Sequence, residues 1–320
     1  MEHRLSLARI EQAPLVIDPL FLNTPQYRAE PLEALLGCRL LVKVETLNPI
    51  RSFKGRGASF SVAALPPTTT TVVCASAGNF GQAVAYAGRA RGIRVIVYAS
   101  RYANPLKLER MRALGAEVRL VGEDFDDAKL EAKRFATAAG VPMMEDGLDP
   151  AIAEGAATIA LELMRYPEPI DDLLVPLGNG ALLTGIGRWT KAVAPATQVI
   201  GVAAAGAPSM VESWRSGRIV THERITTIAD GVGVRLPVPE AVADMYGTVD
   251  DALLVEDQTT LAAMRLIHEH LGLVAEPSGA LGIAALLAQP ERFRGRFVAT
   301  ILCGSNLTLQ QMHDWLVLPA

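Results

Sequence analysis

One lysine near the start of the sequence has the surroundings of a possible nucleophile. Lys54 stands between Phe53 and the glycine-rich stretch 55–57, and it comes just after the run 40–45, which has the pattern of an extended segment. A lysine amine can form a Schiff base with a carbonyl cofactor, and burial favours its neutral, nucleophilic form. Most lysines are solvated surface charges, so the interpretation of Lys54 depends on the motifs that follow it.

Two short turns, each between an expected strand and an expected helix, could bind anions. The first is Ser76-Ala77-Gly78-Asn79-Phe80, and the second is Gly178-Asn179-Gly180-Ala181-Leu182. A turn that opens a helix presents free backbone N–H groups, which bind carboxylate or phosphate, and small residues let the backbone approach the anion closely. For the first turn, an ordinary capped connection between a strand and a helix is an equally good interpretation.

The second turn does not have the fingerprint of a nicotinamide-binding domain. Leu183 stands where the GxGxxG pattern requires its third glycine, and no acidic residue follows at the expected distance of about 20 positions. The Gly-Lys-Ser/Thr sequence of a Walker loop is also missing. The turn therefore fits a cradle for a single phosphate group, and a nicotinamide dehydrogenase is a poor interpretation.

Two further candidates stand near the ends of expected strands. Cys303 directly follows the apolar strand expected at 297–302, and Glu276 stands just before the helix expected at 279–288. Ligands of open α/β sheets bind at the carboxyl ends of strands, so Cys303 could offer a neutral thiol to a ring nitrogen. Taken alone, Cys303 is more simply a buried structural cysteine and Glu276 a solvated carboxylate.

The composition sets the broad class. The chain has 320 residues, of which 50% are hydrophobic and 20% charged, enough for one large or two smaller domains. A net charge of −4 gives no basic signature for nucleic acid, and no apolar run approaches the ~18 residues of a membrane-spanning helix. The three cysteines lack CxxC or ligand spacing, and the mixed N-terminal segment has no apolar core, so we expect no signal peptide. We therefore expect a soluble, cytoplasmic protein.

Strand-like and helix-like segments alternate from about residue 71 onward. We expect strands at 71–75, 93–98, 118–121, 173–177, 199–202 and 297–302, and helices at 81–92, 105–115, 125–140, 151–164, 182–193, 259–272 and 279–288. This alternation predicts an α/β fold with mostly parallel sheets. Breaks at 66–71 and 147–150 bracket a small inserted α/β domain, 70–146, and leave 1–69 and 147–320 as a larger domain.

Together these stretches resemble fold type II, the tryptophan synthase β-family, of pyridoxal-phosphate enzymes, and within it the serine/threonine dehydratases and serine racemase. Six motifs carry the resemblance in the family's order: SFKxRGA at 52–58, SxGNxGQA at 76–83, VPLGNG at 175–180, TIADG at 227–231, EPS at 276–278 and CGxN at 303–306. The resemblance implies two open, twisted, mostly parallel sheets flanked by helices, with pyridoxal 5'-phosphate in the cleft between the two domains. It also implies a homodimer.

The resemblance implies a role for each candidate residue. Lys54 would hold the cofactor as a Schiff base and later act as the base at Cα, and Phe53 would pack beside the cofactor ring. Asn79 would hydrogen-bond the phenolic oxygen, and Cys303 would face the pyridine nitrogen. Glu276 also belongs to the implied cofactor site. The phosphate would lie on Gly178, Asn179, Gly180, Ala181 and Leu182, and the substrate carboxylate on Ser76, Ala77, Gly78, Asn79 and Phe80.

The implied reaction is an α,β-elimination from a small amino acid, which is L-threonine, L-serine or a related β-hydroxy amino acid. The products are a 2-keto acid and ammonia, so the enzyme would be a dehydratase, or ammonia-lyase. A thiol does not hold the pyridine nitrogen protonated as an aspartate would, and this favours elimination over transamination. In the family, the cofactor phosphate protonates the leaving hydroxyl.

Several positions depart from the family's patterns. Phe80 stands where dehydratases commonly have histidine, and Asn179 and Ala181 stand where they usually have glycines. A synthase that replaces the β- or γ-substituent therefore remains an alternative on the same scaffold. Ala77 replaces the second serine of serine racemases, so we expect weak or no racemase activity.

Two other points concern ligands. Ala203 and Ser209 replace the carboxylates with which the family binds a divalent cation, so we expect no metal ion. A non-catalytic amino-acid-binding protein is a remote alternative, against which the intact Ser52-Phe53-Lys54 argues.

Overall fold

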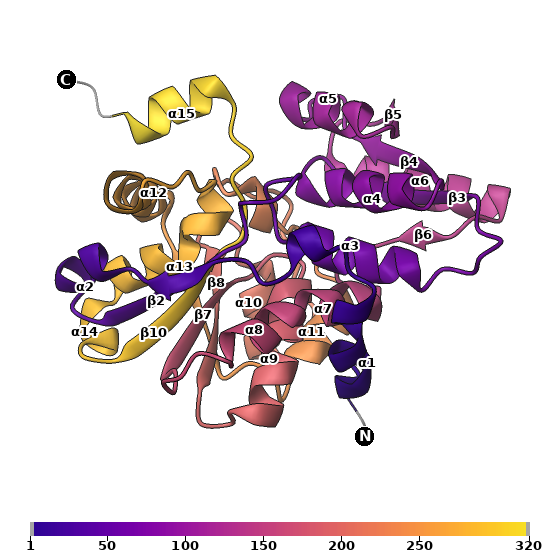
Figure 1. Cartoon of the computed structure of the whole chain (residues 1–320). Helices are drawn as coiled ribbons and strands as arrows, with labels where there is room; N and C mark the ends of the chain where they lie inside the picture. The colour runs from indigo at the N-terminus through magenta and orange to yellow at the C-terminus, as the bar shows by residue number, and fades with distance from the viewer. Residues whose placement is uncertain (1–2, 318–320) are drawn as a thin grey trace.

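The strands of the protein form two separate sheets (Figure 1). The structure is a computed structural model, and it describes residues 3–317. Within this range, the larger sheet has six strands in the order β1 (Gln26–Arg28), β2 (Arg39–Val44), β10 (Phe297–Leu302), β7 (Asp172–Pro176), β8 (Gln198–Ala204) and β9 (Asp251–Val255). Only β1 is antiparallel to its neighbour, and the other pairs are parallel.

Helices cover both faces of this sheet, which explains why β7 and β10 are buried along their whole length. One face packs against α2 (Glu30–Leu36), α12 (Asp257–Leu271) and α13 (Pro277–Ala288). The other packs against α8 (Thr158–Leu163), α9 (Ala181–Val193), α10 (Ser209–Ser216) and α11 (Pro239–Met245). The short α14 (Pro290–Phe293) precedes β10, and α15 (Leu309–Leu316) lies beside α12.

The smaller sheet is entirely parallel, with the strand order β5 (Glu117–Leu120), β4 (Arg94–Ala99), β3 (Thr71–Ala75) and β6 (Met143–Met144). Its two faces pack against different helices. One core contains α4 (Asn79–Ala90) and α5 (Pro105–Ala113), and the other contains α6 (Phe125–Ala139). Both sheets therefore have the mostly parallel α/β architecture that the alternating pattern predicts.

The hydrophobic core beneath α4 does not end at the sheet. It continues into α3 (Lys54–Ala63) and α7 (Pro150–Ala156), together with Leu5 and the 3₁₀ turns at Ala13–Leu15 and Pro19–Phe21. The helix α1 (Leu7–Gln12) lies between Leu5 and the first of these turns. The division at 69/70 and 146/147 thus separates the strands of the two sheets but cuts through a shared core. The two-domain division stays a prediction.

The expected helix at 151–164 is instead two helices, α7 and α8, which meet at Ala157. The Thr158 hydroxyl donates to the Gly155 carbonyl at 2.7 Å, a side-chain bond of the kind that bends helices. The other expected helices and strands are present with ends shifted by a few residues. None of the helices within residues 3–317 is long and apolar enough to cross a membrane.

Candidate active site

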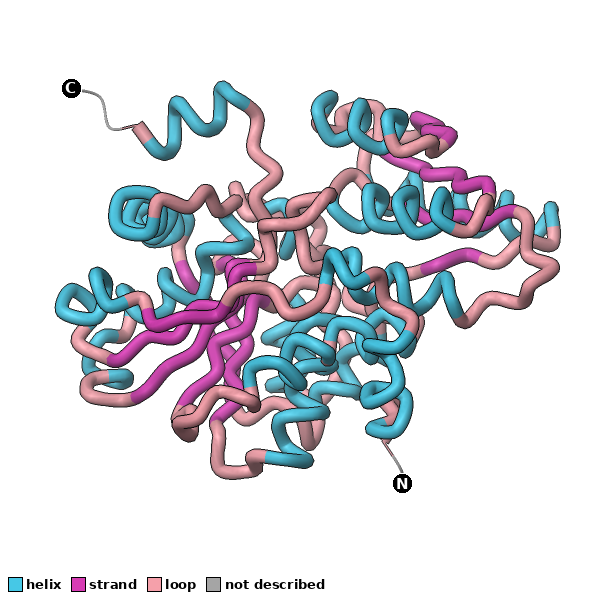
Figure 2. The backbone as a smooth tube through the Cα atoms, viewed as in Figure 1, coloured by secondary structure: helices cyan, strands magenta, loops and turns pink. Residues whose placement is uncertain are grey.

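A cavity of about 510 Å³ lies between the two sheets. Its walls come from the loops after β3, β6, β7 and β10, and Figure 2 shows loops gathering in this region. Every candidate residue from the sequence lines this cavity: Phe53, Lys54, Ser76, Ala77, Gly78, Asn79, Phe80, Gly178, Asn179, Gly180, Ala181, Leu182, Glu276 and Cys303. The fold thus brings together stretches that are more than 200 residues apart in the sequence.

The start of α3 places the Lys54 amine in the cavity. Ser52 forms an isolated bridge with Gly304, and the Phe53 N–H donates to the Cys303 carbonyl at 3.0 Å, so the residues before Lys54 are fixed to the loop after β10. Lys54 Nζ lies 4.8 Å from the centroid of the Phe53 ring and 5.9 Å from that of Phe80. The lysine side chain is only 15% exposed, so its charge has little access to water.

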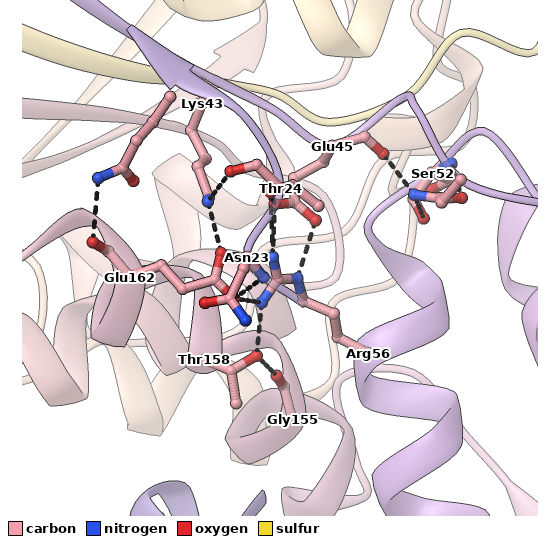
Figure 3. A network of polar contacts seen from close by, with 11 residues as sticks. Asn23, Thr24, Lys43, Glu45, Ser52, Arg56, Gly155, Thr158 and Glu162 are labelled. Carbon is pink, nitrogen blue, oxygen red and sulfur yellow. Dashed lines mark hydrogen bonds and ion pairs between the residues drawn. The ribbon is translucent and has the colours of Figure 1, made fainter. Parts of the chain in front are cut away.

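A buried network of charges holds the other side of α3 (Figure 3). Arg56 has no exposed surface, and its guanidinium donates to both oxygens of Glu45, each at 2.8 Å, and to Glu162 at 2.6 and 2.9 Å. Lys43 from β2 pairs with the same Glu162, and Thr158 accepts a further hydrogen bond from Arg56. The two positive charges of this network therefore balance its two negative charges, and the contacts tie α3 to β2 and α8.

The charges of this network set its pKa values. Burial acts to lower the pKa of Arg56, but Glu45 and Glu162 outweigh it and raise that pKa. Burial acts to raise the pKa of Glu162, but Arg56 and Lys43 outweigh it and lower that pKa. For Lys43, burial is the stronger effect and lowers its pKa despite the Glu162 partner. Removing one member would leave the others charged without full compensation.

The loop after β3 presents the Asn79 amide and backbone N–H groups to the cavity. The Ser76 hydroxyl accepts hydrogen bonds from the Gly78 and Gly81 N–H groups, at 3.1 and 2.9 Å, and so shapes the loop from within. No side chain caps α4 at Gly78, which leaves the Asn79 and Phe80 N–H groups of its first turn to bind an anion. Asn79 donates to Glu276 at 2.6 Å and accepts from Asn306 at 2.8 Å.

The loop after β7 has the backbone of a phosphate cradle. Gly180 caps α9 with φ of +96°, a conformation that favours glycine, and no side chain caps this helix. A Cβ at Gly178 would lie 2.9 Å from the Gly231 carbonyl oxygen, so a larger residue would push the two loops apart. The N-terminus of a 13-residue helix thus faces the cavity without a partner among the described residues, as an anion site requires.

The loop after β10 and the start of α13 form the third wall. Cys303 is 5% exposed, and burial, with the nearby Glu276, raises the pKa of its thiol, which is therefore neutral at physiological pH. The thiol donates to the Ser278 carbonyl at 3.6 Å. The Ser278 hydroxyl is buried and has no hydrogen-bond partner among residues 3–317, so it can satisfy a polar atom of a ligand.

Glu276 is buried, whereas the simplest interpretation of the sequence is a solvated carboxylate. It is 2% exposed, because α13 and the loop after β10 enclose it, and the Asn306 N–H donates to it at 2.9 Å. Burial raises its pKa, while the charge of Lys107 opposes that rise. Glu276 thus lies beside Asn79, where the two sheets meet.

Several cavity residues are not among the candidates from the sequence, and four of them are polar residues close to the candidates: Lys107, Asp146, Asp230 and Ser278. Lys107 is 4% exposed and pairs with Asp230, and Asp146 lies 2.6 Å from the Lys54 amine. Asp230 and Ser278 stand inside the motifs TIADG and EPS, so those motifs gave a signal for them. Lys107 and Asp146 stand outside any motif.

The residues present fit pyridoxal phosphate. An uncapped helix terminus suits the phosphate, the enclosed Lys54 amine suits the carbonyl carbon, and the unpartnered Ser278 hydroxyl and neutral Cys303 thiol suit a ring nitrogen. Within the part of the chain that the structure describes, there is no group of three or more His, Cys, Asp or Glu side chains that could hold a metal ion.

Comparisons with known proteins agree with this arrangement. A family profile described as "Pyridoxal-phosphate dependent enzyme" matches residues 17–304. A putative threonine dehydratase of Sinorhizobium fredii is 32% identical, over 95% of this chain and 93% of the relative. An L-threonine ammonia-lyase of Thermotoga maritima is also 32% identical, over 96% of this chain and 77% of the relative.

Other similar proteins are longer or have solved structures. A biosynthetic L-threonine dehydratase of Pasteurella multocida is 31% identical over 91% of this chain, which spans 57% of that relative's length. The structure of the processed form of threonine deaminase isoform 2 from Solanum lycopersicum matches with a TM-score of 0.88 at 29% identity, over 98% of this chain and 90% of the other. Maize serine racemase matches with a TM-score of 0.88 at 28% identity, over 97% and 96%.

Proposed function

We propose, because this chain belongs to the family of pyridoxal-phosphate dependent enzymes, that it is a lyase acting on L-threonine, L-serine or a related β-hydroxy amino acid. The reaction releases a 2-keto acid and ammonia. The observation that carries the proposal is the Lys54 amine, which shares one enclosed cavity with two helix N-termini and a neutral thiol. When bound, pyridoxal phosphate supplies an electron sink that weakens the Cα–H bond of an amino acid.

Three parts of the chain would hold the cofactor. The backbone of 178–182 binds the phosphate, because the dipole and free N–H groups of α9 favour negative charge there. Lys54 supplies the amine that bonds to the carbonyl carbon. Cys303 would offer the pyridine nitrogen a neutral thiol and give it no positive charge, which favours elimination over transamination.

The substrate is oriented by the loop after β3. The N–H groups at the first turn of α4 bind its carboxylate, and this places Cα within reach of the Lys54 amine, which removes the proton. The rings of Phe53 and Phe80 lie beside Lys54 and keep water away from the amine. Water exclusion strengthens every charge interaction in the cavity.

A replacement synthase is the second candidate, and the position of Phe80 supports it. The Phe80 ring, 5.9 Å from Lys54 Nζ, lines the cavity with apolar surface where the dehydratase pattern has histidine. Such a wall suits a second substrate less polar than water. Adding thiol or amine nucleophiles to the assay and looking for a new amino acid separates the two reactions.

The test of the proposal is release of keto acid by the purified protein loaded with pyridoxal phosphate. L-threonine and L-serine are assayed in parallel, and 2-oxobutanoate and pyruvate are the expected products. Lys54→Ala should abolish the release. Lys191→Ala is the matched control, because the Lys191 amine faces Asp250 and the Thr197 carbonyl, outside the cavity. A yellow protein that releases neither keto acid would overturn the lyase proposal and favour a replacement reaction.

A further inference from the structure

Asp146 occupies a position in the cavity that no motif of the sequence indicates. It follows β6 on the smaller sheet, and its Oδ2 atom lies 2.6 Å from Lys54 Nζ. The next residue, Gly147, has φ of +87°, and a Cβ there would lie 2.6 Å from the Asn179 carbonyl oxygen. Only glycine lets this turn approach the phosphate loop so closely, and the approach brings the Asp146 carboxylate to the Lys54 amine.

The two carboxylate oxygens of Asp146 have different surroundings. Asn179 donates a long hydrogen bond of 3.4 Å to Oδ2, whereas Oδ1 is buried and has no partner among residues 3–317. The neighbouring acids of the same turn are engaged elsewhere: Glu145 pairs with Lys129 and Lys133, and Asp149 caps α7. Asp146 is thus the acid of this turn that contacts the Lys54 amine, and it lines the cavity.

We propose that Asp146 is a second proton-transfer residue of the site, one that donates a proton to the leaving β-hydroxyl group. This inference rests on the proposed elimination. The Lys54 amine takes the Cα proton and becomes an ammonium group, which Asp146 faces at hydrogen-bond distance. Asp146 takes that proton through Oδ2, the oxygen that contacts the amine, and its carboxyl group delivers a proton to the departing oxygen.

The step is balanced. The electron pair of the Cα–H bond forms the new carbon–carbon double bond, and the pair of the C–O bond leaves with the oxygen, which departs as water. Lys54 and Asp146 return to their initial protonation states, so no further acid or base is consumed. The proposal replaces the cofactor phosphate, which the family resemblance implies as the acid, with a residue of this chain.

The experiment compares two leaving groups in Asp146→Asn. Hydroxide needs a proton to leave, whereas chloride does not, so the variant should lose activity on L-serine but keep it on β-chloro-L-alanine. General acid catalysis contributes about 10²–10⁴-fold, and we expect a loss of at least ~100-fold in kcat for L-serine. The loss for β-chloro-L-alanine should stay within about 5-fold, since that step needs no acid. Equal losses on both substrates, or no loss on either, would overturn the proposal.

Glu145→Gln is the matched control, because it removes the neighbouring carboxylate without touching Lys54. It should change the ratio of the two activities by less than about 2-fold, well below the acid-catalysis range. The two proposals fail in different ways. If the wild-type protein eliminates neither hydroxide nor chloride, the proposed function fails. If the wild type is active but Asp146→Asn affects both substrates equally, only the role of Asp146 fails.

A second readout uses the protein without cofactor. A neutral amine-reactive reagent is added, and modification of the peptide that contains Lys54 is followed by mass spectrometry. The ion pair with Asp146 holds the amine away from the reagent, so Asp146→Asn should be modified at Lys54 several-fold faster than wild type. An unchanged rate would show that the pair is absent in solution and would overturn the proposal. Equal melting temperatures of variant and wild type exclude misfolding as the cause.

Discussion

Asn79 Nδ2 lies 2.6 Å from Glu276 Oε1, and this contact joins the first turn of α4 to the start of α13. Asn306 donates to the side-chain carbonyl oxygen of Asn79 at 2.8 Å, so both ends of the amide are held. The second N–H of the amide has no other partner among the described residues and remains for a ligand oxygen. Glu276 and Asn306 thereby act as positioning residues for Asn79, at the junction of the two sheets.

Glu276→Ala should therefore weaken binding of pyridoxal phosphate. Loss of the hydrogen bond frees the Asn79 amide to rotate, and a loss of about 1–2 kcal/mol corresponds to roughly 5–30-fold in Kd. Titration of the cofactor by absorbance measures the effect. Glu240→Ala removes an exposed carboxylate of α11 and should leave the Kd unchanged. An unchanged Kd in Glu276→Ala would refute the positioning role.

Asn179→Asp tests the phosphate cradle. The substitution preserves the side-chain shape but adds a negative charge in the loop that caps α9, where the phosphate is expected to bind. We expect the affinity for pyridoxal phosphate to fall by about 10-fold or more, that is by ~1.4 kcal/mol. The affinity for pyridoxal, which lacks the phosphate, should fall much less. Gln198→Glu adds the same charge at an exposed position and serves as the control; equal losses for both ligands would place the phosphate elsewhere.

Arg56→Leu should destabilise the protein strongly. It leaves Glu45 and Glu162 as buried carboxylates without their main partner, a change that costs about 3–5 kcal/mol. The melting temperature should fall by on the order of 10 °C. Arg94→Ala breaks an exposed pair with Glu117 and should cost less than ~1 kcal/mol. A melting temperature within 2 °C of wild type, roughly the effect of 1 kcal/mol, would show that the network adds little stability.

The lowered pKa of Glu162 predicts a pH dependence of stability. Its pKa lies below the ordinary value of 4.5 in the folded state, so its contribution is fully present above pH 4.5 and is lost as the pH falls through the lowered value. The gap in melting temperature between wild type and Glu162→Gln should therefore be largest near neutral pH and narrow below about pH 4.5. Glu269→Gln, at an exposed position, should show no gap at any pH. A gap that widens in acid would mean that Glu162 stabilises the fold more when it is protonated, and this would contradict its role as a charged partner of Arg56 and Lys43.

The local features of the site could be predicted from the sequence because each lies directly beside a strand or a helix start. The apolar runs before Ser76, Gly178 and Cys303 indicate strands, and a residue that follows a parallel strand must lie at the carboxyl edge of its sheet. Lys54 could be chosen because its flanking residues match a known motif. For these residues the sequence pattern and the fold are linked by a simple geometric rule.

Asp146 and Lys107 could not be predicted in this way. Strand β6 has only two residues and lies at the edge of its sheet, so nothing in the local pattern around 143–146 indicates that Asp146 reaches the cavity. Lys107 lies inside α5 with its charge buried, and its contact with Asp230 depends on how the two sheets face each other. Such contacts arise from tertiary packing between distant segments, which spacing along the chain does not reveal.

Trapping the cofactor on the protein tests the central claim most directly. Borohydride reduction of the protein loaded with pyridoxal phosphate fixes the bond between cofactor and lysine, and mass spectrometry of the peptides then identifies the modified residue. The account predicts one reduced cofactor per chain, on the peptide that contains Lys54, and none in Lys54→Ala. Modification of Lys107 or Lys129, the other lysines that line the cavity, or of no lysine at all, would contradict it.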